Sequence, residues 1–303
     1  MRGMALGLAA LLASVGIAQA QTGPAEVGAS EEIAGSSDRS NRMTVPVRVG
    51  RHDQFHFIVD TGSQRTVISN EVATRLALAP IEKRRIVGIA GTEIADTTVL
   101  GELALGRRSF FDMPVLLFEA AHIGADGLIG TDSLQDQRVL IDFVNNSMTV
   151  SDARSQGGNS GFEIVVTARR RAGQLIVTQA EVDGVRTAII VDTGSDTSIG
   201  NRALQRALGQ RGTLTSAVLT SVTGQEVTVE IGFARKIGIG DVAIANAVIA
   251  YTDGPAFGAL KLDNRPAMML GMRELRLFRR IAIDFAQRKV LFDMPSKSRP
   301  REF

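Results

Sequence analysis

Cysteine is absent from this chain of 303 residues, tyrosine occurs once and histidine three times. The absence of cysteine excludes disulfide bonds, thiolate zinc sites, cysteine catalysis and a lipid-modified N-terminal cysteine. The histidines His52, His56 and His122 do not have the spacing of metal ligands. We therefore expect neither a metal ion nor a cofactor.

The chain also has no excess of one charge. Lys plus Arg number 34 against 32 Asp plus Glu, for a formal net charge of +2, and no block of like charge stands out. This pattern does not favour nucleic acid as a partner. A content of 44% hydrophobic and 22% charged residues excludes wholesale disorder, and the length suits one large or two small domains.

Long hydrophobic runs are missing, except at the N-terminus. Met1–Gly3 carries one positive charge, an apolar stretch runs from Met4 to Ile17, and Ala18-Gln19-Ala20 follows. This order is typical of a secretory signal cleaved before Gln21. An uncleaved membrane anchor is the alternative, but the apolar stretch is short of the roughly 20 residues that span a bilayer. We predict a signal peptide over 1–20 and an exported mature protein without stable membrane insertion.

Residues 21–42 are rich in Gly, Ser, Ala and charged residues and hold few large apolar groups. Such a composition does not bury enough apolar surface to pack. We expect a flexible linker here, with a removable pro-segment as the alternative.

One seven-residue pattern occurs twice. Phe57–Ser63 reads F-I-V-D-T-G-S and Ile189–Ser195 reads I-I-V-D-T-G-S, with the two aspartates, Asp60 and Asp192, 132 residues apart. A single D-T-G-S would arise easily by chance. Two copies, each at the end of an apolar β-type run, indicate related segments.

Further landmarks follow each copy in the same order. They are a helical patch (Asn70–Leu78 and Asn201–Leu208), a hairpin signal (Gly88–Glu93 and Ser221–Glu226), two apolar residues before glycine (Leu128–Gly130 and Met269–Gly271), and Ile-Asp-Phe before a turn (Ile141–Phe143 and Ile283–Phe285). Such a repeated order indicates an internal duplication, with units over 43–152 and 162–294 and a flexible linker over 155–161.

Apolar segments within both units are short, β-branched and interrupted by glycine. This pattern favours mainly antiparallel β structure with one or two short helices per unit. We predict a mainly β protein of two pseudo-symmetric, barrel-like lobes.

An aspartate between a strand and a Thr-Gly turn presents its carboxylate on a sharp bend, where Gly62 and Gly194 permit close approach. If the two turns meet across a pseudo-twofold axis, Asp60 and Asp192 face each other at about 3 Å and share one proton. One carboxyl then acts as general base on a trapped water while the other, as general acid, protonates a carbonyl oxygen. Neither a metal nor a covalent intermediate is needed.

On these features each unit resembles a retropepsin-type aspartic protease domain, and the tandem resembles the two-lobed aspartic peptidases. The resemblance covers almost all of 43–294 and implies retropepsin-like lobes with Asp60 and Asp192 as the catalytic dyad. It implies reciprocal hydrogen bonds between the turns from Thr61 and Thr193. It also implies that the hydroxyls of Ser63 and Ser195 bind the outer carboxylate oxygens.

The same resemblance implies that both hairpins are flaps, which close over an extended peptide or protein substrate. The flap tips would be formed by Ile89, Ala90, Gly91 and Thr92 in the first unit and by Val222, Thr223, Gly224 and Gln225 in the second. A monomer that acts as a pseudo-dimer is favoured, with a homodimer of tandem chains left open.

Two departures from the two-lobed eukaryotic enzymes refine the comparison. Those enzymes usually carry a tyrosine on the first flap and commonly contain disulfides, whereas Tyr251 lies outside both hairpins and cysteine is absent. Exported bacterial retropepsin-like proteins are the nearer comparison, which implies a periplasmic or secreted location.

Two other functions compete with an aspartic endopeptidase. A catalytically silent peptide-binding module could use the same fold, although both aspartates are retained. A nucleotide phosphotransferase of the actin and hexokinase type also uses two D-x-G turns, but the export signal and the lack of long helices between the motifs argue against it.

Overall fold

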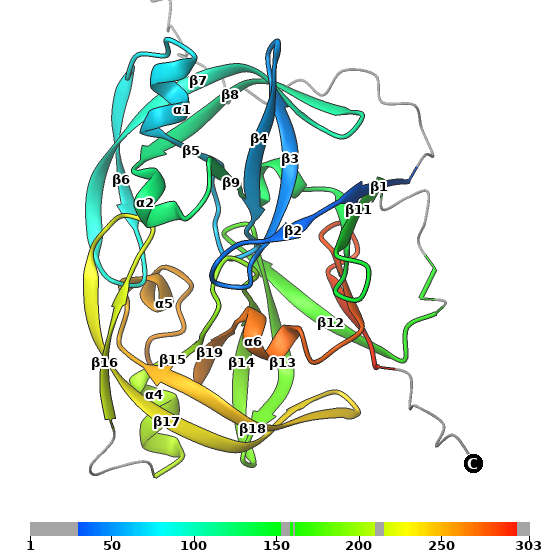
Figure 1. Ribbon diagram of the computed structural model, residues 1–303. Coiled ribbons are helices and arrows are strands. Elements are labelled where there is room, and N and C mark those ends of the chain that lie inside the picture. Colours follow the sequence, from blue (N-terminus) through cyan, green and yellow to red (C-terminus); the bar gives the residue numbers. More distant parts are fainter. Residues whose placement is uncertain (1–29, 153–157, 160, 210–214, 296–303) are drawn as a thin grey trace, which may run out of the picture.

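The computed structural model describes residues 30–152, 158–159, 161–209 and 215–295 (Figure 1). The predicted signal peptide lies outside these residues, as does most of the predicted linker between the units. As predicted, the fold is mainly β and consists of two lobes with short helices. We refer to residues 30–152 as lobe 1 and to residues 161–295 as lobe 2.

Lobe 1 is built from strands that follow one another through short turns. Its elements are β1 (Glu31–Ala34), β2 (Ser36–Ser37), β3 (Met43–Val49), β4 (His52–Val59), β5 (Val67–Ser69), α1 (Asn70–Arg75), β6 (Glu82–Val87), β7 (Thr92–Leu105), β8 (Arg108–Phe118), α2 (Ala120–Ile123), β9 (Gly127–Ile129), α3 (Thr131–Leu134), β10 (Gln137–Asp142) and β11 (Ser147–Asp152).

Lobe 2 repeats this plan. Its elements are β12 (Ile164–Arg171), β13 (Gln174–Val182), β14 (Val185–Val191), β15 (Ser198–Gly200), α4 (Arg202–Ala207), β16 (Thr215–Thr220), β17 (Glu226–Ile239), β18 (Val242–Tyr251), α5 (Pro255–Ala259), β19 (Ala267–Leu270), α6 (Met272–Leu275), β20 (Arg280–Asp284) and β21 (Lys289–Asp293).

Both helical patches predicted from the sequence are confirmed. The side chain of Ser69 accepts a hydrogen bond from the Val72 amide (3.1 Å) at the start of α1, and Asn201 accepts one from the Leu204 amide (2.9 Å) at the start of α4. Such N-caps satisfy amides that have no partner within the helix.

In both lobes a parallel strand pair leads to the D-T-G-S turn. β4 pairs in parallel with β9, and β14 pairs in parallel with β19. Strands β4 and β14 are almost wholly apolar and buried where they approach their turns, because both faces of each strand are covered. The predicted apolar residues before Gly130 and Gly271 lie in β9 and β19. These two strands fix the position of the two turns.

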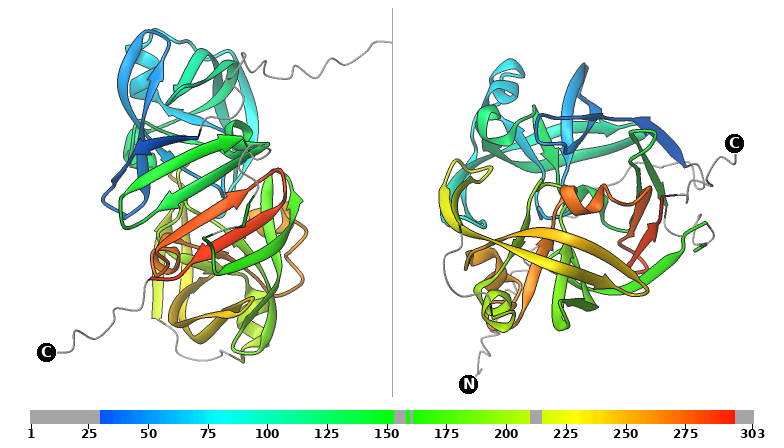
Figure 2. Two further views of the ribbon diagram at one scale, coloured as in Figure 1. Left: turned by 90° about the vertical axis from the view of Figure 1, so that its right-hand side faces the viewer. Right: turned by 60° about the horizontal axis from the view of Figure 1, so that its bottom comes forward.

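The lobes are joined by a central sheet with the strand order β1-β11-β10-β20-β21-β12. Its middle is the antiparallel pairing of β10 with β20, in which Ile141 lies opposite Ile281. Figure 2 shows these strands side by side between the lobes. The Ile-Asp-Phe landmarks therefore belong to the hairpins that connect the two lobes, a role that their repetition alone did not indicate.

Residues 31–37 differ from the prediction of a flexible linker over 21–42. β1 pairs with β11, β2 pairs with β3, and the side chain of Ile33 is buried. That prediction is wrong for 31–37 because edge pairing and a single buried side chain hold the segment despite its polar composition. Residues 21–29 lie outside the described residues.

The repeat therefore begins before residue 43. β1 occupies the place in lobe 1 that β12 occupies in lobe 2, since β1 pairs with β11 and β12 pairs with the equivalent strand β21. Across the described ranges, no helix is long and apolar enough to cross a bilayer.

Candidate active site

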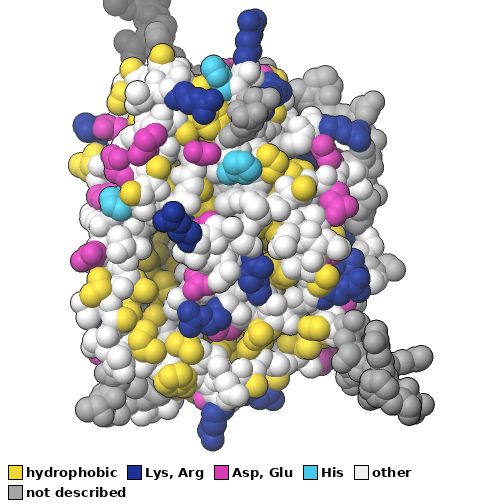
Figure 3. Space-filling model, viewed as in Figure 1, with side chains coloured by type: hydrophobic (Ala, Val, Ile, Leu, Met, Phe, Trp, Pro, Cys, Tyr) yellow, Lys and Arg dark blue, Asp and Glu magenta, His cyan; other side chains and the backbone are white. Residues whose placement is uncertain are grey.

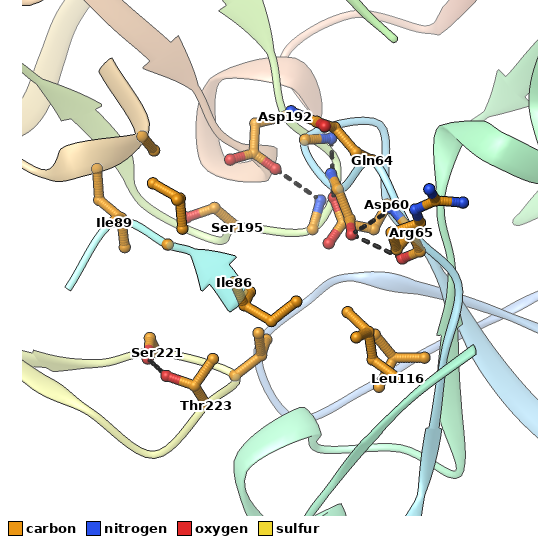
Figure 4. Close-up of a pocket in the computed structure, with 18 of the residues that line it drawn as sticks. Asp60, Gln64, Arg65, Ile86, Ile89, Leu116, Asp192, Ser195, Ser221 and Thr223 are labelled. Atoms are coloured by element: carbon orange, nitrogen blue, oxygen red, sulfur yellow. Dashed lines mark hydrogen bonds between the residues drawn. The ribbon is translucent and has the colours of Figure 1, made fainter. Parts of the chain in front are cut away.

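The two D-T-G-S turns meet at the interface between the lobes, within one chain. Asp60 follows β4, and its amide donates to the Ile129 carbonyl of β9 (3.0 Å); the Asp192 amide donates in the same way to the Leu270 carbonyl of β19 (3.0 Å). Figure 4 shows both aspartates on neighbouring loops at one side of a pocket, with flap residues across from them.

The two threonines hold the turns together. The Thr61 amide donates to the hydroxyl of Thr193 (3.1 Å), and the Thr193 amide donates to the hydroxyl of Thr61 (3.2 Å). Each hydroxyl also donates to a carbonyl at the end of the other lobe's strand, Val191 at 2.7 Å and Val59 at 2.6 Å. The reciprocal hydrogen bonds implied by the resemblance are therefore present, and they are buried.

The glycines of the turns lie directly against the opposite carboxylates. A Cβ atom on Gly62 would overlap the carboxylate of Asp192, and one on Gly194 would overlap that of Asp60. Only a residue without a side chain permits this approach. Each carboxylate is thus pressed against the turn of the other lobe.

Both carboxyls are 8% exposed, and burial raises the pKa of each. At Asp60 this rise is opposed by hydrogen bonds from the amides of Gly62 (2.8 Å) and Ser63 (2.9 Å) and by the charge of Arg42. Burial, followed by the negative charge of Asp60, raises the pKa of Asp192 to about 7. Because the charge of Asp60 raises the pKa of Asp192, the pair releases its two protons in separate steps, and a state with one proton lies between them.

The serine hydroxyls do not have the predicted partners. The hydroxyl of Ser63 donates to the Arg65 carbonyl (2.8 Å), and that of Ser195 donates to the Thr197 carbonyl (2.8 Å). The Asp60 carboxylate is bound instead by the backbone amide of Ser63. The expected side-chain contact is wrong because each hydroxyl closes its own turn two residues on, which serine commonly does.

An outer pair of side chains also connects the turns, and sequence reasoning missed it. The guanidinium of Arg42 donates to the Gly194 carbonyl (3.3 Å) and to the Ile123 carbonyl at the end of α2 (2.6 Å). The side-chain amide of Gln174 donates to the Gly62 carbonyl. Arg42 and Gln174 lie 132 residues apart, the spacing of the two motifs, so this spacing applied backwards along the chain would have paired them.

The positive charge of Arg42 also acts on the dyad, because it lowers the pKa of both aspartates. Its side chain is 11% exposed and forms a salt bridge with Asp38 (2.6 Å). A residue from the segment predicted to be a linker therefore acts on both candidate catalytic carboxyls.

An acid lies behind each turn, Asp132 half-buried in lobe 1 and Glu274 buried in lobe 2. Asp132 accepts hydrogen bonds from the amide (3.0 Å) and hydroxyl (2.8 Å) of Thr66, and Glu274 accepts one from Ser198. Burial raises the pKa of both acids. The hydroxyls of Thr66 and Ser198 in turn accept hydrogen bonds from the amides of Gly130 and Gly271. These two glycines therefore pack against the turns.

The predicted flaps are hairpins whose tips cross to the opposite lobe. The β6–β7 tip reaches α5, where the Ala256 amide donates to the Gly88 carbonyl (3.2 Å) and Ile89 packs on an apolar cluster of lobe 2. Val222, at the β16–β17 tip, packs on an apolar cluster of lobe 1. The tips also touch, because Gly91 lies against the Gln225 side chain.

Between the turns and the flaps lies a cavity of about 760 Å³. Ile89, Val222 and Thr223 line it together with both aspartates, whereas Ala90, Gly91, Thr92, Gly224 and Gln225 belong to the hairpins without lining it; Thr92 is already the first residue of β7. A cleft of this size, apolar with a few convergent polar groups, suits a short extended chain. The described residues hold no cluster of His, Asp and Glu suited to a metal ion.

Two similar β lobes that join paired Asp-Thr-Gly turns under two flaps define an acid-protease fold. Comparison with known families agrees: the model of the aspartyl protease family matches residues 45–133 and again residues 178–273. These two matches cover more than half of the chain, one in each lobe. The chain therefore belongs to the aspartyl protease family.

Proposed function

We propose that this protein is an aspartic endopeptidase that hydrolyses peptide bonds with a water molecule activated between Asp60 and Asp192. The observation that carries the proposal is the pair of buried carboxyls, joined through their turns, with Asp192 raised to a pKa of about 7. Such a pair supplies one base and one acid at the same time.

In the proposed reaction the ionised carboxylate takes a proton from the water, whose oxygen bonds to the peptide carbonyl carbon. The protonated carboxyl donates its proton to the carbonyl oxygen. When the resulting diol collapses, the carboxyl that took the proton from water passes it to the nitrogen, the other carboxylate takes a proton from one diol hydroxyl, and the C–N bond breaks. The products are a carboxylic acid and an amine, and the dyad again holds one proton.

We further propose that one chain suffices for activity and that it works after export, as the pattern of residues 1–20 suggests. Support for a single chain comes from the Thr61 and Thr193 hydrogen bonds, which join the two turns of the same molecule.

The test is cleavage of a peptide library by the wild type, Asp60→Asn and Asp192→Asn. Each variant is expected to lose at least about 1,000-fold in kcat/KM, since the dyad works as a unit. Asp142→Asn, at the end of β10, is the matched control and keeps activity, since the side chain of Asp142 only accepts hydrogen bonds from the turn that follows. Peptide binding without cleavage by the wild type would favour the silent module, and stabilisation by ATP would favour phosphotransfer.

A further inference from the structure

The two sides of the cleft have different charges. Lobe 1 contributes four arginines and a histidine to the lining, whereas the lining residues of lobe 2 include no basic side chain and carry only the acids Asp192 and Asp196. In Figure 3 a basic side chain lies beside the hollow at the left, where hydrophobic side chains are visible.

The difference occurs at positions that the duplication makes equivalent. Arg65 follows its D-T-G-S turn at the place where Thr197 follows the other, and Arg42 corresponds to Gln174. The six-residue flap strands β6 and β16 read E-K-R-R-I-V and T-S-A-V-L-T. When the two strands are aligned, Arg84 and Arg85 correspond to Ala217 and Val218. The fold is repeated here, but the charge is not.

Two of these arginines remain available to a ligand. Arg65 and Arg85 are exposed, and neither forms a salt bridge within the described residues. The charge of Arg65 acts on Asp132, whose pKa it lowers, without forming an ion pair. By contrast, Arg84 is bound by Glu82, and Asp196 is paired with Arg273 (3.4 Å). Free guanidinium groups at a cleft edge are suited to carboxylates, which they bind through two parallel hydrogen bonds.

We propose that the cleft selects an extended peptide with an acidic side chain, aspartate or glutamate, on the one side of the scissile bond that faces lobe 1, where Arg65 and Arg85 line the cleft. This inference rests on the proposed function and adds its substrate class. A symmetric cleft would accept an extended chain in either direction. A single basic side makes one direction favourable, because the reversed peptide would place its acid against lobe 2, whose lining residues include no basic side chain.

The experiment uses one cleavable peptide in which Asp, Asn or Lys is placed at each position on either side of the scissile bond. For the wild type, kcat/KM is expected to be about tenfold higher for Asp than for Asn on one side only, the size of two partly screened ion pairs. The preference is expected to shrink at high salt.

The variants exchange each arginine for the residue at the equivalent place in lobe 2. Arg65→Thr/Arg85→Val is expected to abolish the preference, and Arg65→Glu/Arg85→Glu to reverse it toward Lys. Lys83→Ser is the matched control on the same strand: Lys83 pairs with Asp96 (2.8 Å), does not line the cleft, and its loss should leave the preference intact. Melting temperatures check that each variant folds.

Two failures are distinguishable. Cleavage without an acidic preference, or a preference that survives Arg65→Thr/Arg85→Val, overturns this inference and leaves the peptidase standing. If the wild type cleaves none of the peptides, the proposed endopeptidase function is wrong. Binding of the labelled Asp, Asn and Lys peptides to Asp60→Asn, with and without the paired arginine replacements and followed by fluorescence anisotropy, then still decides the charge preference.

Discussion

The two lobes share their interior at the active site and differ at its edge. Inside, Thr61 and Thr193 exchange equivalent hydrogen bonds, and each glycine receives the opposite carboxylate. At the edge, Arg65 occupies the position that Thr197 has in lobe 2, and Arg85 the position that Val218 has. Interior positions are constrained by the other lobe, because a change in one turn is felt at once by the other. Edge positions face the cleft and are free to diverge.

The largest effect is expected where the lobes are most alike. Gly62→Ala and Gly194→Ala would each place a methyl group in the space held by the opposite carboxylate. We expect each to lose at least about 100-fold in kcat/KM, as displacements of about 1 Å at reacting groups do. Peptide cleavage measures this, with Gly101→Ala as control because a Cβ there meets open space. Full activity in either variant would contradict the closeness of the carboxylates.

Thr61→Val and Thr193→Val test the symmetry of the hydrogen bonds. Each removes a buried hydroxyl and leaves an amide of the other lobe unpaired, which costs about 1–3 kcal/mol in the free energy of unfolding. The double variant should cost slightly less than the sum, since the only contact that both single variants remove is the one between the two hydroxyls (3.4 Å). Urea unfolding gives these values, and the corresponding serine variants serve as controls that keep the hydroxyl. Clearly unequal single effects would break the comparison.

Ile33→Ala and Val166→Ala compare β1 with β12, the strands that pair with β11 and β21 of the central sheet. Both side chains are buried, and each truncation is expected to lower the free energy of unfolding by about 2 kcal/mol. A flexible linker would show no effect for Ile33→Ala. Glu32→Ala, exposed on the same strand, is the control and should stay within about 0.5 kcal/mol of the wild type.

Stability should depend on pH through Asp192. Its pKa of about 7 in the folded state lies above the ordinary value of 3.8, so the folded protein binds the proton more tightly than the unfolded chain. This contribution is complete below about pH 4 and is lost as the pH rises to 7. Unfolding free energies measured across this range should fall with pH, and Asp192→Asn should flatten the slope; an unchanged slope would contradict the raised pKa.

The smallest effect is expected from exchanging the outer pair. Arg42→Gln removes a charge that lowers the pKa of both aspartates, so both limbs of the pH profile of kcat/KM should move to higher pH. Gln174→Arg should move them to lower pH. Arg39→Gln, exposed on the same segment as Arg42, is the control. If Arg42→Gln lowers kcat/KM without shifting its pH profile, the role of Arg42 is purely structural.

The sequence allowed the repeat, the mainly β lobes, the helical patches and the meeting of Asp60 with Asp192 to be predicted, because each has a local signal that occurs twice. β1 was missed since its composition is polar and only pairing with β11 makes it a strand. The spacing of 132 residues, taken back from the predicted start of the second unit at 162, leads to residue 30 and would have included it.

Contacts between side chains and carbonyl groups were harder to foresee. The hydroxyl of Ser63 has two acceptors within reach along the chain, the Asp60 carboxylate three residues before it and the Arg65 carbonyl two residues after it, and a turn motif does not decide between them. The β10–β20 pairing was missed for a related reason: each hairpin has a clear local signal, but its partner strand lies in the other lobe.

The crossed flaps have a kinetic consequence. Ile89 is seated on lobe 2 and Val222 on lobe 1, so lifting either hairpin uncovers an apolar patch on the lobe opposite to its own. When a peptide enters, its own side chains must therefore replace the apolar contacts that Ile89 and Val222 make with the opposite lobes. Association should be slow compared with diffusion and should quicken in solvents that weaken apolar contacts, even though no acid takes part in that step.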